Sequence, residues 1–579
     1  MAIRKVKGTI VRILDHSPLR DTPIEIWDRD LLLDDKIASG LTDDDGVFEV
    51  QYDTLNTENK PDLTLKVLRL SGSSGGYEVV YEEDGPRNVS SDFDFQLVEI
   101  AGWEYDDDNT IPLVYSPDAG FTSSPQNFVF AQTAKLGIQG FLLKRRQKKA
   151  AKQATLAAAQ NEFEPNKTIN MEKANPGSTR TDGFFMNALL NGFAPAHPTH
   201  NRDDDTYHVR YNIDDYLVDH KANKHEAPSV HLTLERSGSD LVPKSIEYQV
   251  RVAGSNPPKY KLATTATPGS GAAWEQAKFY FRIAELIDGQ VKGHLGRGHI
   301  NVGQYAIAFY RNIQKSPIMK LLHPHLKGVS AINTLGKDII FGADGILSLS
   351  PLTTDSLKQV MRDDLGQCDW KEWSPRKSLS PKHTYAEIQK RYWNHLVSHV
   401  DSFFQTHGPK IVRDWTEVFH MSEDLVDHSV PFVSPSLATG EEWYDQNEIS
   451  SDHGTRGAKA ISLITSSQTG PSTAEVDNLK QMCAYIIYHA TIWHDWRNDG
   501  QNDYAGELEY ARLSINYTPV EAALQLLVVN LLVKVKHGYI TRNEEGDIPA
   551  GLVERLRDDR NWFNNLDYDV RNLRSRINI

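Results

Sequence analysis

His294-Leu295-Gly296-Arg297-Gly298-His299 lies in a segment whose pattern is compatible with a helix. The two histidines are five residues apart, which on a regular α-helix separates them by about 140° around the axis. A π-helical turn, with i→i+5 hydrogen bonds, would bring both side chains to one face, and such turns are frequent at functional sites. Gly293, Gly296 and Gly298 each lower helix stability by about 1 kcal/mol relative to alanine. The sequence therefore predicts a widened helical turn here.

A second helix-compatible segment, about two hundred residues further along the chain, adds an imidazole and an amide. His494 and Asn498 are four residues apart, so an α-helix places them on one face, one turn apart. The chain ends at Ile579, whose main-chain carboxylate is a further expected donor. Imidazole suits iron, copper, nickel and zinc, and a carboxylate raises the preference for iron or manganese. The pattern predicts a mononuclear metal site.

Spacing alone does not select these histidines. The chain contains 21 of them, and an isolated pair at helical spacing is more often part of an ordinary core or helix face. Pairs with an equal claim are His395 with His399, His323 with His325, and His489 with His494. A choice between them needs a longer pattern.

Four separated stretches supply that pattern. They are Thr181-Asp182-Gly183-Phe184-Phe185-Met186, Trp274-x-x-Ala277-Lys278 with Gln290, His294 and His299, Pro317-Ile318-x-Lys320-Leu321-Leu322-x-Pro324-His325 with Ile332-Asn333, and His494-x-x-x-Asn498-x-Gly500-Gln501. In this order they resemble the catalytic domain of lipoxygenases, over about residues 165 to 579. The terminal isoleucine matches as well. The resemblance implies a mainly α-helical catalytic domain.

The resemblance also implies one non-haem iron per chain, with manganese as an alternative metal. Its ligands would be His294, His299, His494, Asn498 and the carboxylate of Ile579. Gln290 and Gln501 match amides that would link the ligands to the substrate cavity. Simple helix-to-helix hydrogen bonding is the alternative role for these two glutamines.

Three further residues are expected at the substrate pocket. Ala343 falls where the family carries an alanine or glycine that steers oxygen, and alanine is usually associated there with S-configured hydroperoxides. Leu347 would line a deep apolar pocket with it. Arg512 lies close to the place where a plant-type motif is absent, and it could meet a substrate carboxylate.

The function implied by the resemblance is insertion of O2 into a polyunsaturated fatty acid of the linoleate type. A ferric hydroxide would take a hydrogen atom from a doubly allylic methylene and so become ferrous iron and water. O2 would add to the resulting radical, and the peroxyl radical would be reduced by the ferrous ion and protonated to give a hydroperoxide. The protein would contribute geometry, by holding one methylene of a long acyl chain in place.

Two departures from the family pattern keep other functions open. Asp495-Trp496-Arg497 stands where members commonly have small or apolar residues, so it could reshape the cavity or add charge near it. The segment from His494 to Ile579 is shorter than in plant and animal members. The same iron scaffold could therefore act as a hydroperoxide isomerase or an oxidase of a non-lipid substrate, or the chain could be a non-catalytic binding protein.

Composition narrows the setting. A chain of 579 residues predicts two domains, one of them large. A formal charge of −15 argues against nucleic-acid binding. With only Cys368 and Cys483 and no apolar run at the N-terminus, we expect a reducing, cytoplasmic location. We also expect a monomer, whose partners are the fatty acid and O2.

Residues 1–105 have a different character from the rest. Apolar residues alternate with polar ones in Gly8–Leu14, Ile24–Asp28 and Val47–Val50, and Asp43-Asp44-Asp45-Gly46 is a turn signal. This predicts an antiparallel β-sandwich. The pattern Pro23-Ile24-Glu25-Ile26-Trp27-Asp28 is similar to transthyretin-like domains, whereas many lipoxygenases carry a different, membrane-docking β-sandwich here.

Residues 106–165 are expected to form a basic connector, with one long surface helix over Gln132–Gln160. Its basic run suits a solvated face or a clamp on the acidic catalytic domain, and contact with an anionic membrane is the alternative. In the catalytic domain, residues 166–579, only a small β section is expected, at Tyr207–Val218 and Ser245–Val252. Ala522–Val533 reads as a buried helix.

Overall fold

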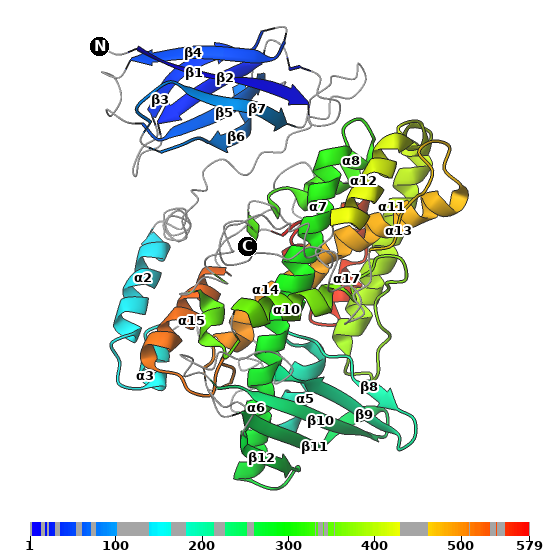
Figure 1. Cartoon of the computed structure of the whole chain (residues 1–579). Helices are drawn as coiled ribbons and strands as arrows, with labels where there is room; N and C mark the ends of the chain where they lie inside the picture. Colours follow the sequence, from blue (N-terminus) through cyan, green and yellow to red (C-terminus); the bar gives the residue numbers. More distant parts are fainter. Residues whose placement is uncertain are drawn as a thin grey trace.

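The computed structural model of the chain describes most of the sequence in separate stretches. These are residues 3–12, 18–19, 22–28, 35–43, 45–53, 61–70, 77–87, 89–100, 138–163, 181–213, 226–251, 260–329, 332–333, 340, 345–352, 354–428, 461–508, 510–532, 540 and 550–577. Figure 1 shows strands β1–β7 at the N-terminal end and a helix-rich part that follows, with a further sheet, of β8–β12, at one end of the helices.

The N-terminal strands form two sheets. One has the order β4 (Val47–Asp53), β1 (Ile3–Arg12), β7 (Phe93–Ile100), and the other β3 (Asp35–Leu41), β2 (Pro23–Asp28), β5 (Leu63–Leu70), β6 (Tyr77–Asp84). Their buried side chains form one apolar core, which includes Val6, Ile24, Phe48 and Leu65. The predicted β-sandwich is confirmed.

One strand pair differs from the antiparallel prediction. β1 and β7 run parallel, with Ile10 opposite Val98, whereas the other pairs in these two sheets are antiparallel. Alternation fixes which face of a strand is buried but not the direction of its neighbour. The sequence therefore could not reveal a parallel pair between the first and last strands.

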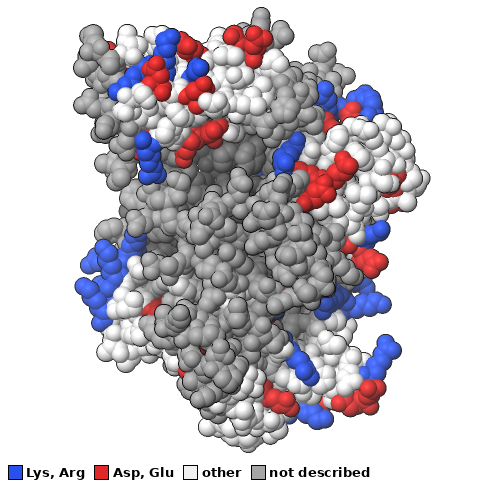
Figure 2. All heavy atoms as spheres, in the orientation of Figure 1, with Lys and Arg blue, Asp and Glu red and all other residues white. Residues whose placement is uncertain are grey.

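In its described part, residues 138–163, the connector has two helices, so the prediction of one long helix over Gln132–Gln160 is wrong. α2 (Ile138–Ala150) ends before a break, and α3 (Leu156–Asn161) begins after Thr155, whose side chain accepts a hydrogen bond from the Ala158 N–H. Threonine favours such a cap, which starts a new helix. Figure 2 shows basic side chains gathered where α2 lies, and the basic residues of that helix are Lys144, Arg145, Arg146, Lys148 and Lys149.

Both connector helices contact α15 (Pro519–Leu532). One buried apolar cluster joins them to it. The cluster includes Ala150, Ala159 and Phe163 of the connector and Ala522 and Leu526 of α15. The connector thus docks on α15 through apolar side chains, and the clamp expected of its basic run stays a prediction. In its described part, α15 is the buried helix expected at Ala522–Val533.

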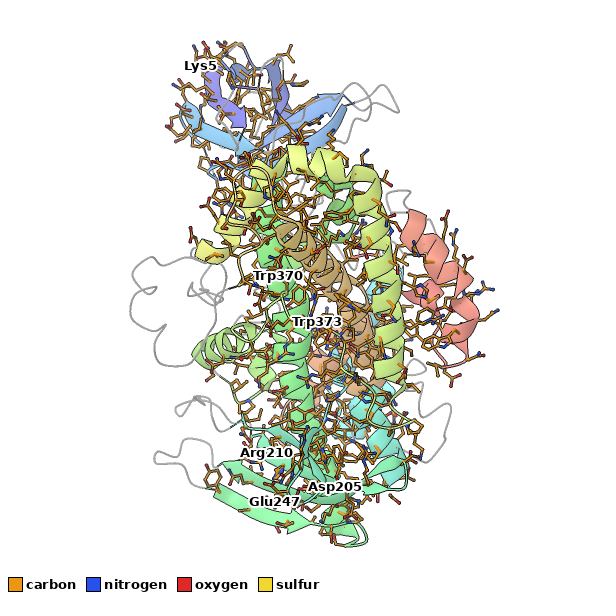
Figure 3. The ribbon with its side chains drawn as sticks, turned by 90° about the vertical axis from the view of Figure 1, so that its right-hand side faces the viewer. Lys5, Asp205, Arg210, Glu247, Trp370 and Trp373 are labelled. Atoms are coloured by element: carbon orange, nitrogen blue, oxygen red, sulfur yellow. The ribbon has the colours of Figure 1, made fainter. Side chains whose placement is uncertain are left out.

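The sheet in the catalytic part is larger than predicted. Five antiparallel strands follow the order β12 (Tyr260–Ala266), β11 (Asp240–Arg251), β10 (Pro228–Ser237), β9 (Thr206–Tyr211), β8 (Thr199–Asn201). Figure 3 places the labelled Asp205, Arg210 and Glu247 at this sheet, away from Lys5 in the N-terminal strands and from Trp370 and Trp373 among the helices. Helix α6 (Ala272–Asp288) covers its apolar face.

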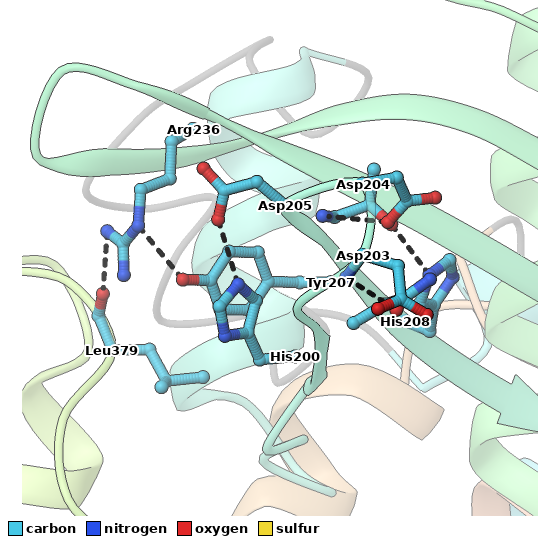
Figure 4. A network of polar contacts seen from close by, with 10 residues as sticks. His200, Asp203, Asp204, Asp205, Tyr207, His208, Arg236 and Leu379 are labelled. Carbon is cyan, nitrogen blue, oxygen red and sulfur yellow. Dashed lines mark hydrogen bonds and ion pairs between the residues drawn. The ribbon is translucent and has the colours of Figure 1, made fainter.

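Polar contacts hold the short β8 edge in place (Figure 4). His200 Nε2 lies 2.8 Å from Asp205 Oδ1, and Thr206 donates a hydrogen bond to Asp204 over 2.6 Å. Arg236 donates to the Tyr207 hydroxyl over 2.9 Å. These strands depend on such contacts and on α6. The alternation of apolar and polar residues along the sequence therefore predicts too few strands for this sheet.

Two interrupted helices form the centre of the helical part. The first runs through α6, η2 (Gly289–Ile300) and α7 (Asn301–Asn312), and the second through α13 (Thr473–Tyr488), η4 (His489–Trp493) and α14 (His494–Ala505). Around them the structure has α5 (Asp182–Asn191), α8 (Ile318–Leu326), η3 (Ile346–Leu349), α10 (Thr354–Leu365), α11 (Thr384–Arg413), α12 (Trp415–His428), α16 (Ala550–Asp558), α17 (Arg560–Asn564) and η5 (Val570–Asn572). Among the described residues, no helix has the length and apolar character needed to cross a membrane.

A capping box starts the second central helix. The Ser472 side chain accepts from the Glu475 N–H, and Glu475 accepts from the Ser472 N–H over 2.8 Å. Hydrogen bonds from the Thr465 hydroxyl and the Ser472 N–H lower the pKa of Glu475 to about 2, from a usual value of 4.5. A lowered carboxyl pKa stabilises the fold above pH 4.5, and this contribution is lost as the pH falls towards 2.

We therefore expect Glu475→Gln to lower the Tm most above pH 5, with a difference from the wild type that narrows as the pH falls to 3. Thermal unfolding followed by circular dichroism at pH 7, 5, 4 and 3 measures this difference. A Tm difference that stays constant over these pH values would contradict the proposed role of the ionised carboxylate.

Candidate metal centre

Segment η2 is a π-helix, as the five-residue spacing predicted. Its i→i+5 repeat brings His294 and His299 to one face, with ring centroids 5.0 Å apart. Gly293 permits close approach of the second central helix, because a Cβ atom there would lie 3.0 Å from Nε of Arg497. One of the glycines that disfavour a regular helix thus also makes room for a neighbour.

The second ligand helix is interrupted by a π-helix that the sequence did not predict. Segment η4 ends at Trp493, directly before His494. His489 lies at its start and its Nδ1 is 2.8 Å from the carbonyl oxygen of Tyr485, away from the three-histidine cluster described below. Of the two signals that identified η2, η4 therefore has only the five-residue spacing, from His489 to His494, because the segment contains no glycine.

Three histidines converge at one point. Nε2 of His494 lies 3.0 Å from Nε2 of His299 and 3.3 Å from Nε2 of His294. The three side chains belong to residues that are at most 4% exposed. In the described part of the chain, this is the only group of at least three His, Cys, Asp or Glu side chains whose donor atoms lie within 4.8 Å of one another.

The outer ring nitrogens of two of these histidines face amide oxygens. Nδ1 of His299 is 3.1 Å from Oδ1 of Asn333, and Nδ1 of His294 is 3.4 Å from Oε1 of Gln290. An amide oxygen only accepts hydrogen bonds, so each Nδ1 carries the proton and each Nε2 presents a lone pair. Burial, with the charges of His299 and Arg497, moves the pKa of His294 well below its usual value.

Converging lone pairs on neutral imidazoles repel one another unless a cation lies between them. Neutral imidazole is also the form that binds iron, zinc and copper. The three histidines therefore fit a metal ion by their number, burial, protonation and direction.

Asn498 lies one turn after His494 on α14 and is fully buried. Its Nδ2 has no hydrogen-bond partner, and its Oδ1 accepts a hydrogen bond from Gln501 over 3.3 Å. Leaving a buried amide N–H unpaired costs about 1–3 kcal/mol. Rotation of the amide would instead present the oxygen, an accepted metal donor, on that side.

Gln290 and Gln501 join the two ligand helices. Gln290 Nε2 donates to Gln501 Oε1 over 2.8 Å, and the pair connects His294 at one end with Asn498 at the other. Both side chains are buried. The pair makes the helix-to-helix hydrogen bond considered as the alternative, and its predicted link to a substrate cavity stays a prediction.

The expected pocket residues are less completely placed. Leu347 is buried in η3 and belongs to the same apolar core as α6. The Arg512 guanidinium lies 4.7 Å above the Phe279 ring, on α6. Ala343 and Ile579 lie outside the described residues, so their roles stay predictions.

Asp495, Trp496 and Arg497 contact the surrounding framework. The Asp495 carboxylate meets Arg574 over 2.5 Å, and the Trp496 indole donates to the carbonyl oxygen of Gly192 over 3.0 Å. Arg497 lies over the Trp493 ring at 3.4 Å. The charge expected near the site is that of Arg497, which contributes to the low pKa of His294.

Sequence reasoning missed two neighbours of the cluster. Asn333 belongs to the quoted Ile332-Asn333 motif, but only the structure shows that it accepts from His299. Arg574 carried no motif, and its contact with Asp495 joins residues 79 positions apart.

Comparison with known proteins gives matches to lipoxygenases. The lipoxygenase family pattern matches residues 218–358, which include η2. A 9R-lipoxygenase from Cyanothece has a similar structure, with a TM-score of 0.72 and 30% identity, over 100% of this chain and 92% of that one. A coral 8R-lipoxygenase shares the fold, with a TM-score of 0.55 and 15% identity over 98% of this chain and 96% of that one.

A curated relative matches over a shorter region. The linolenate 9R-lipoxygenase of Nostoc is 25% identical over 335 residues, which are 56% of this chain and 37% of that protein. The chain thus spans little more than a third of that relative. The match to the Cyanothece structure, in contrast, runs through nearly the whole of both chains, and together with the three-histidine cluster it shows that this protein belongs to the lipoxygenase family.

Proposed function

We propose that the protein is a dioxygenase that inserts O2 into a polyunsaturated fatty acid of the linoleate type and releases a hydroperoxide. The observation that carries this proposal is the convergence of three buried imidazole nitrogens on two π-interrupted helices. His294, His299 and His494 would hold one iron ion, with Asn498 and the Ile579 carboxylate as further ligands.

A bound iron would supply one-electron chemistry at a weak C–H bond, which is what a reaction between a fatty acid and O2 needs. The chain itself supplies the setting. Burial excludes water from the histidines and strengthens the electrostatic interactions there. Asn333 and Gln290 keep the protons of His299 and His294 on Nδ1, so that Nε2 of each ring stays available.

The relatives support the substrate class and raise a question about configuration. Two of them carry 9R-lipoxygenase in their names, one with linolenate as its substrate. An alanine at position 343 predicts the S configuration instead. Chiral chromatography of the hydroperoxide decides between these two arguments, because each predicts one enantiomer in excess.

The test of the proposed function is incubation of the iron-loaded protein with linoleic acid and with linolenic acid in air. We expect conjugated-diene absorbance to rise with matching uptake of O2. Loss of added fatty-acid hydroperoxide without O2 uptake would support the isomerase alternative. Absence of bound iron or manganese after native purification would support a non-catalytic binding protein.

The role assigned to Asn333 gives a separate prediction. In Asn333→Ala the His299 ring loses the acceptor of its Nδ1 proton, and loss of such a partner typically costs about 10–100-fold in metal affinity. We expect a decrease of that size in iron affinity, measured by competition with a chelator. Asn312→Ala is the matched control, because the Asn312 amide donates to Asp424 and Ala308 instead of a histidine. Equal iron affinities for the two variants would exclude this role.

A further inference from the structure

A buried ion-pair cluster joins α14 to the C-terminal segment. Arg574 Nη1 lies 2.5 Å from Asp495 Oδ1 and 2.6 Å from Asp499 Oδ1. The side chains of Arg574 and Asp495 are 6% and 5% exposed, while that of Asp499 is 44% exposed. We call these three residues the Arg574 clasp. One of them, Asp495, directly follows His494 in the sequence.

Other contacts hold the same segment on either side of Arg574. His325 of α8 donates through Nδ1 to the Ser575 carbonyl oxygen over 2.6 Å, and the Ile540 N–H donates to the Leu573 carbonyl oxygen over 2.9 Å. Leu573 and Ile577 are fully buried. The segment therefore runs through the apolar interior at residues 573–577.

Trp496, next to Asp495, makes a second contact between α14 and the C-terminal region. Its ring stacks on Tyr568, with centroids 5.2 Å apart and planes 24° apart. Two consecutive residues of the stretch that departs from the family pattern thus hold the C-terminal region by different chemistry, one by charge and one by stacking.

The clasp fixes the relative position of its partners more than it adds to the stability of the fold. Removing an arginine and an aspartate from water costs several kcal/mol per ion, so an apolar pair of similar volume is often as stable or more stable. An ion pair with hydrogen-bond geometry, in contrast, fixes where its partners lie along and around a helix.

We propose that Arg574 is a positioning residue, which sets the register of residues 573–577 against α14 and thereby holds in place the helix that carries His494 and Asn498. This inference rests on the proposed function for the role of these two residues as iron ligands. Both carboxylates of the clasp lie next to them in the sequence, because Asp495 directly follows His494 and Asp499 directly follows Asn498.

The first test uses metal-free protein, so it does not depend on the proposed function. We expect Arg574→Met to speed amide hydrogen exchange at residues 573–577 at least about tenfold, since fewer contacts then oppose local opening. Arg574→Lys, which can still pair with one carboxylate, should remain closer to the wild type. The matched control is Arg571→Met, which removes an exposed pair with Asp569 three residues earlier. Equal exchange in Arg574→Met and Arg571→Met would overturn the proposal.

The second test uses iron-loaded protein and measures iron release to a chelator. We expect release from Arg574→Met to be at least about tenfold faster than from Arg571→Met, with partial rescue in Arg574→Lys. If the wild type binds no iron, the proposed function fails, and the exchange experiment still judges the clasp.

A double variant separates positioning from stability. Asp495→Leu combined with Arg574→Met replaces the buried pair by apolar side chains and should restore the Tm, including where Arg574→Met alone does not fold. We expect iron release from the folded double variant to stay fast. Release as slow as in the wild type would show that the clasp contributes packing alone and would overturn the proposal.

Discussion

Replacing His494 by alanine is expected to remove the metal and with it the measurable turnover of linoleic acid. The His494 ring contacts both other rings of the cluster, since its Nε2 lies 3.0 Å from Nε2 of His299 and 3.3 Å from Nε2 of His294. Loss of an outer hydrogen-bond partner typically costs about 10–100-fold in metal affinity, and loss of a direct ligand should exceed this range. Iron per chain, measured by mass spectrometry after native purification, should therefore fall below about a tenth of the wild-type value.

Two further variants make this result specific. His494→Gln keeps most of the side-chain volume, so a similar loss of iron in a folded protein would exclude an effect of the cavity alone. His395→Ala is the control. The spacing of His395 and His399 gave this pair an equal claim to be metal ligands, but Nε2 of His395 contacts Asp559 instead. Iron content in His395→Ala should match the wild type. Normal iron content in His494→Ala would refute the assignment of the site.

The second large effect is expected from Gly500→Val. A Cβ atom at this position of α14 would lie 2.8 Å from the Cα atom of Phe193, a backbone atom that cannot turn aside. The ring of Phe193 also packs closely on Gly289, since its Cε1 lies 2.6 Å from where a Cβ atom of Gly289 would be. Overpacking of this kind costs about 1–3 kcal/mol, and the backbone contact places this variant at the upper end.

The displaced helix carries Asn498 and Gln501 on either side of the glycine. Iron affinity in Gly500→Val should therefore fall by roughly tenfold, which is the lower end of the range for loss of a hydrogen-bond partner of a metal ligand. Gly183→Val is the control, since Gly183 is exposed on α5 and its nearest atom, the Thr181 hydroxyl oxygen, lies 4.0 Å from an added Cβ. Urea unfolding and chelator competition should show both losses in Gly500→Val and neither in Gly183→Val. Equal behaviour would mean that the contact with Phe193 does not constrain the helix.

Much of the metal site could be predicted from the sequence because its signal is local. His294 and His299 are five residues apart and have glycines around them, so a π-turn was needed to bring the two side chains to one face of the helix. Segment η4 shares the five-residue spacing, from His489 to His494, but it has no glycine, and Ala490, Thr491 and Ile492 suit a regular buried helix equally well. Its existence depends on packing against neighbours that are distant in sequence.

Two of the errors in the fold have the same origin. The direction of β7 relative to β1 and the extent of the five-stranded sheet are decided by contacts between elements. The division of the connector at Thr155 rests instead on a local cap, which the alanine-rich composition of the segment concealed. Asp495 shows the limit at a single residue. The sequence marks it as unusual beside a ligand, but its partner Arg574 lies 79 positions away and is found only in three dimensions.

The docking of the connector on α15 also bears on how the catalytic part can be isolated. Ala150, Ala159 and Phe163 cover Ala522, Ala523 and Leu526, so a truncation at residue 165 would expose an apolar patch to water. Exposed patches of this kind promote aggregation. A shortened enzyme that stays monodisperse therefore has to start ahead of Ile138, which makes the two connector helices part of the smallest soluble unit.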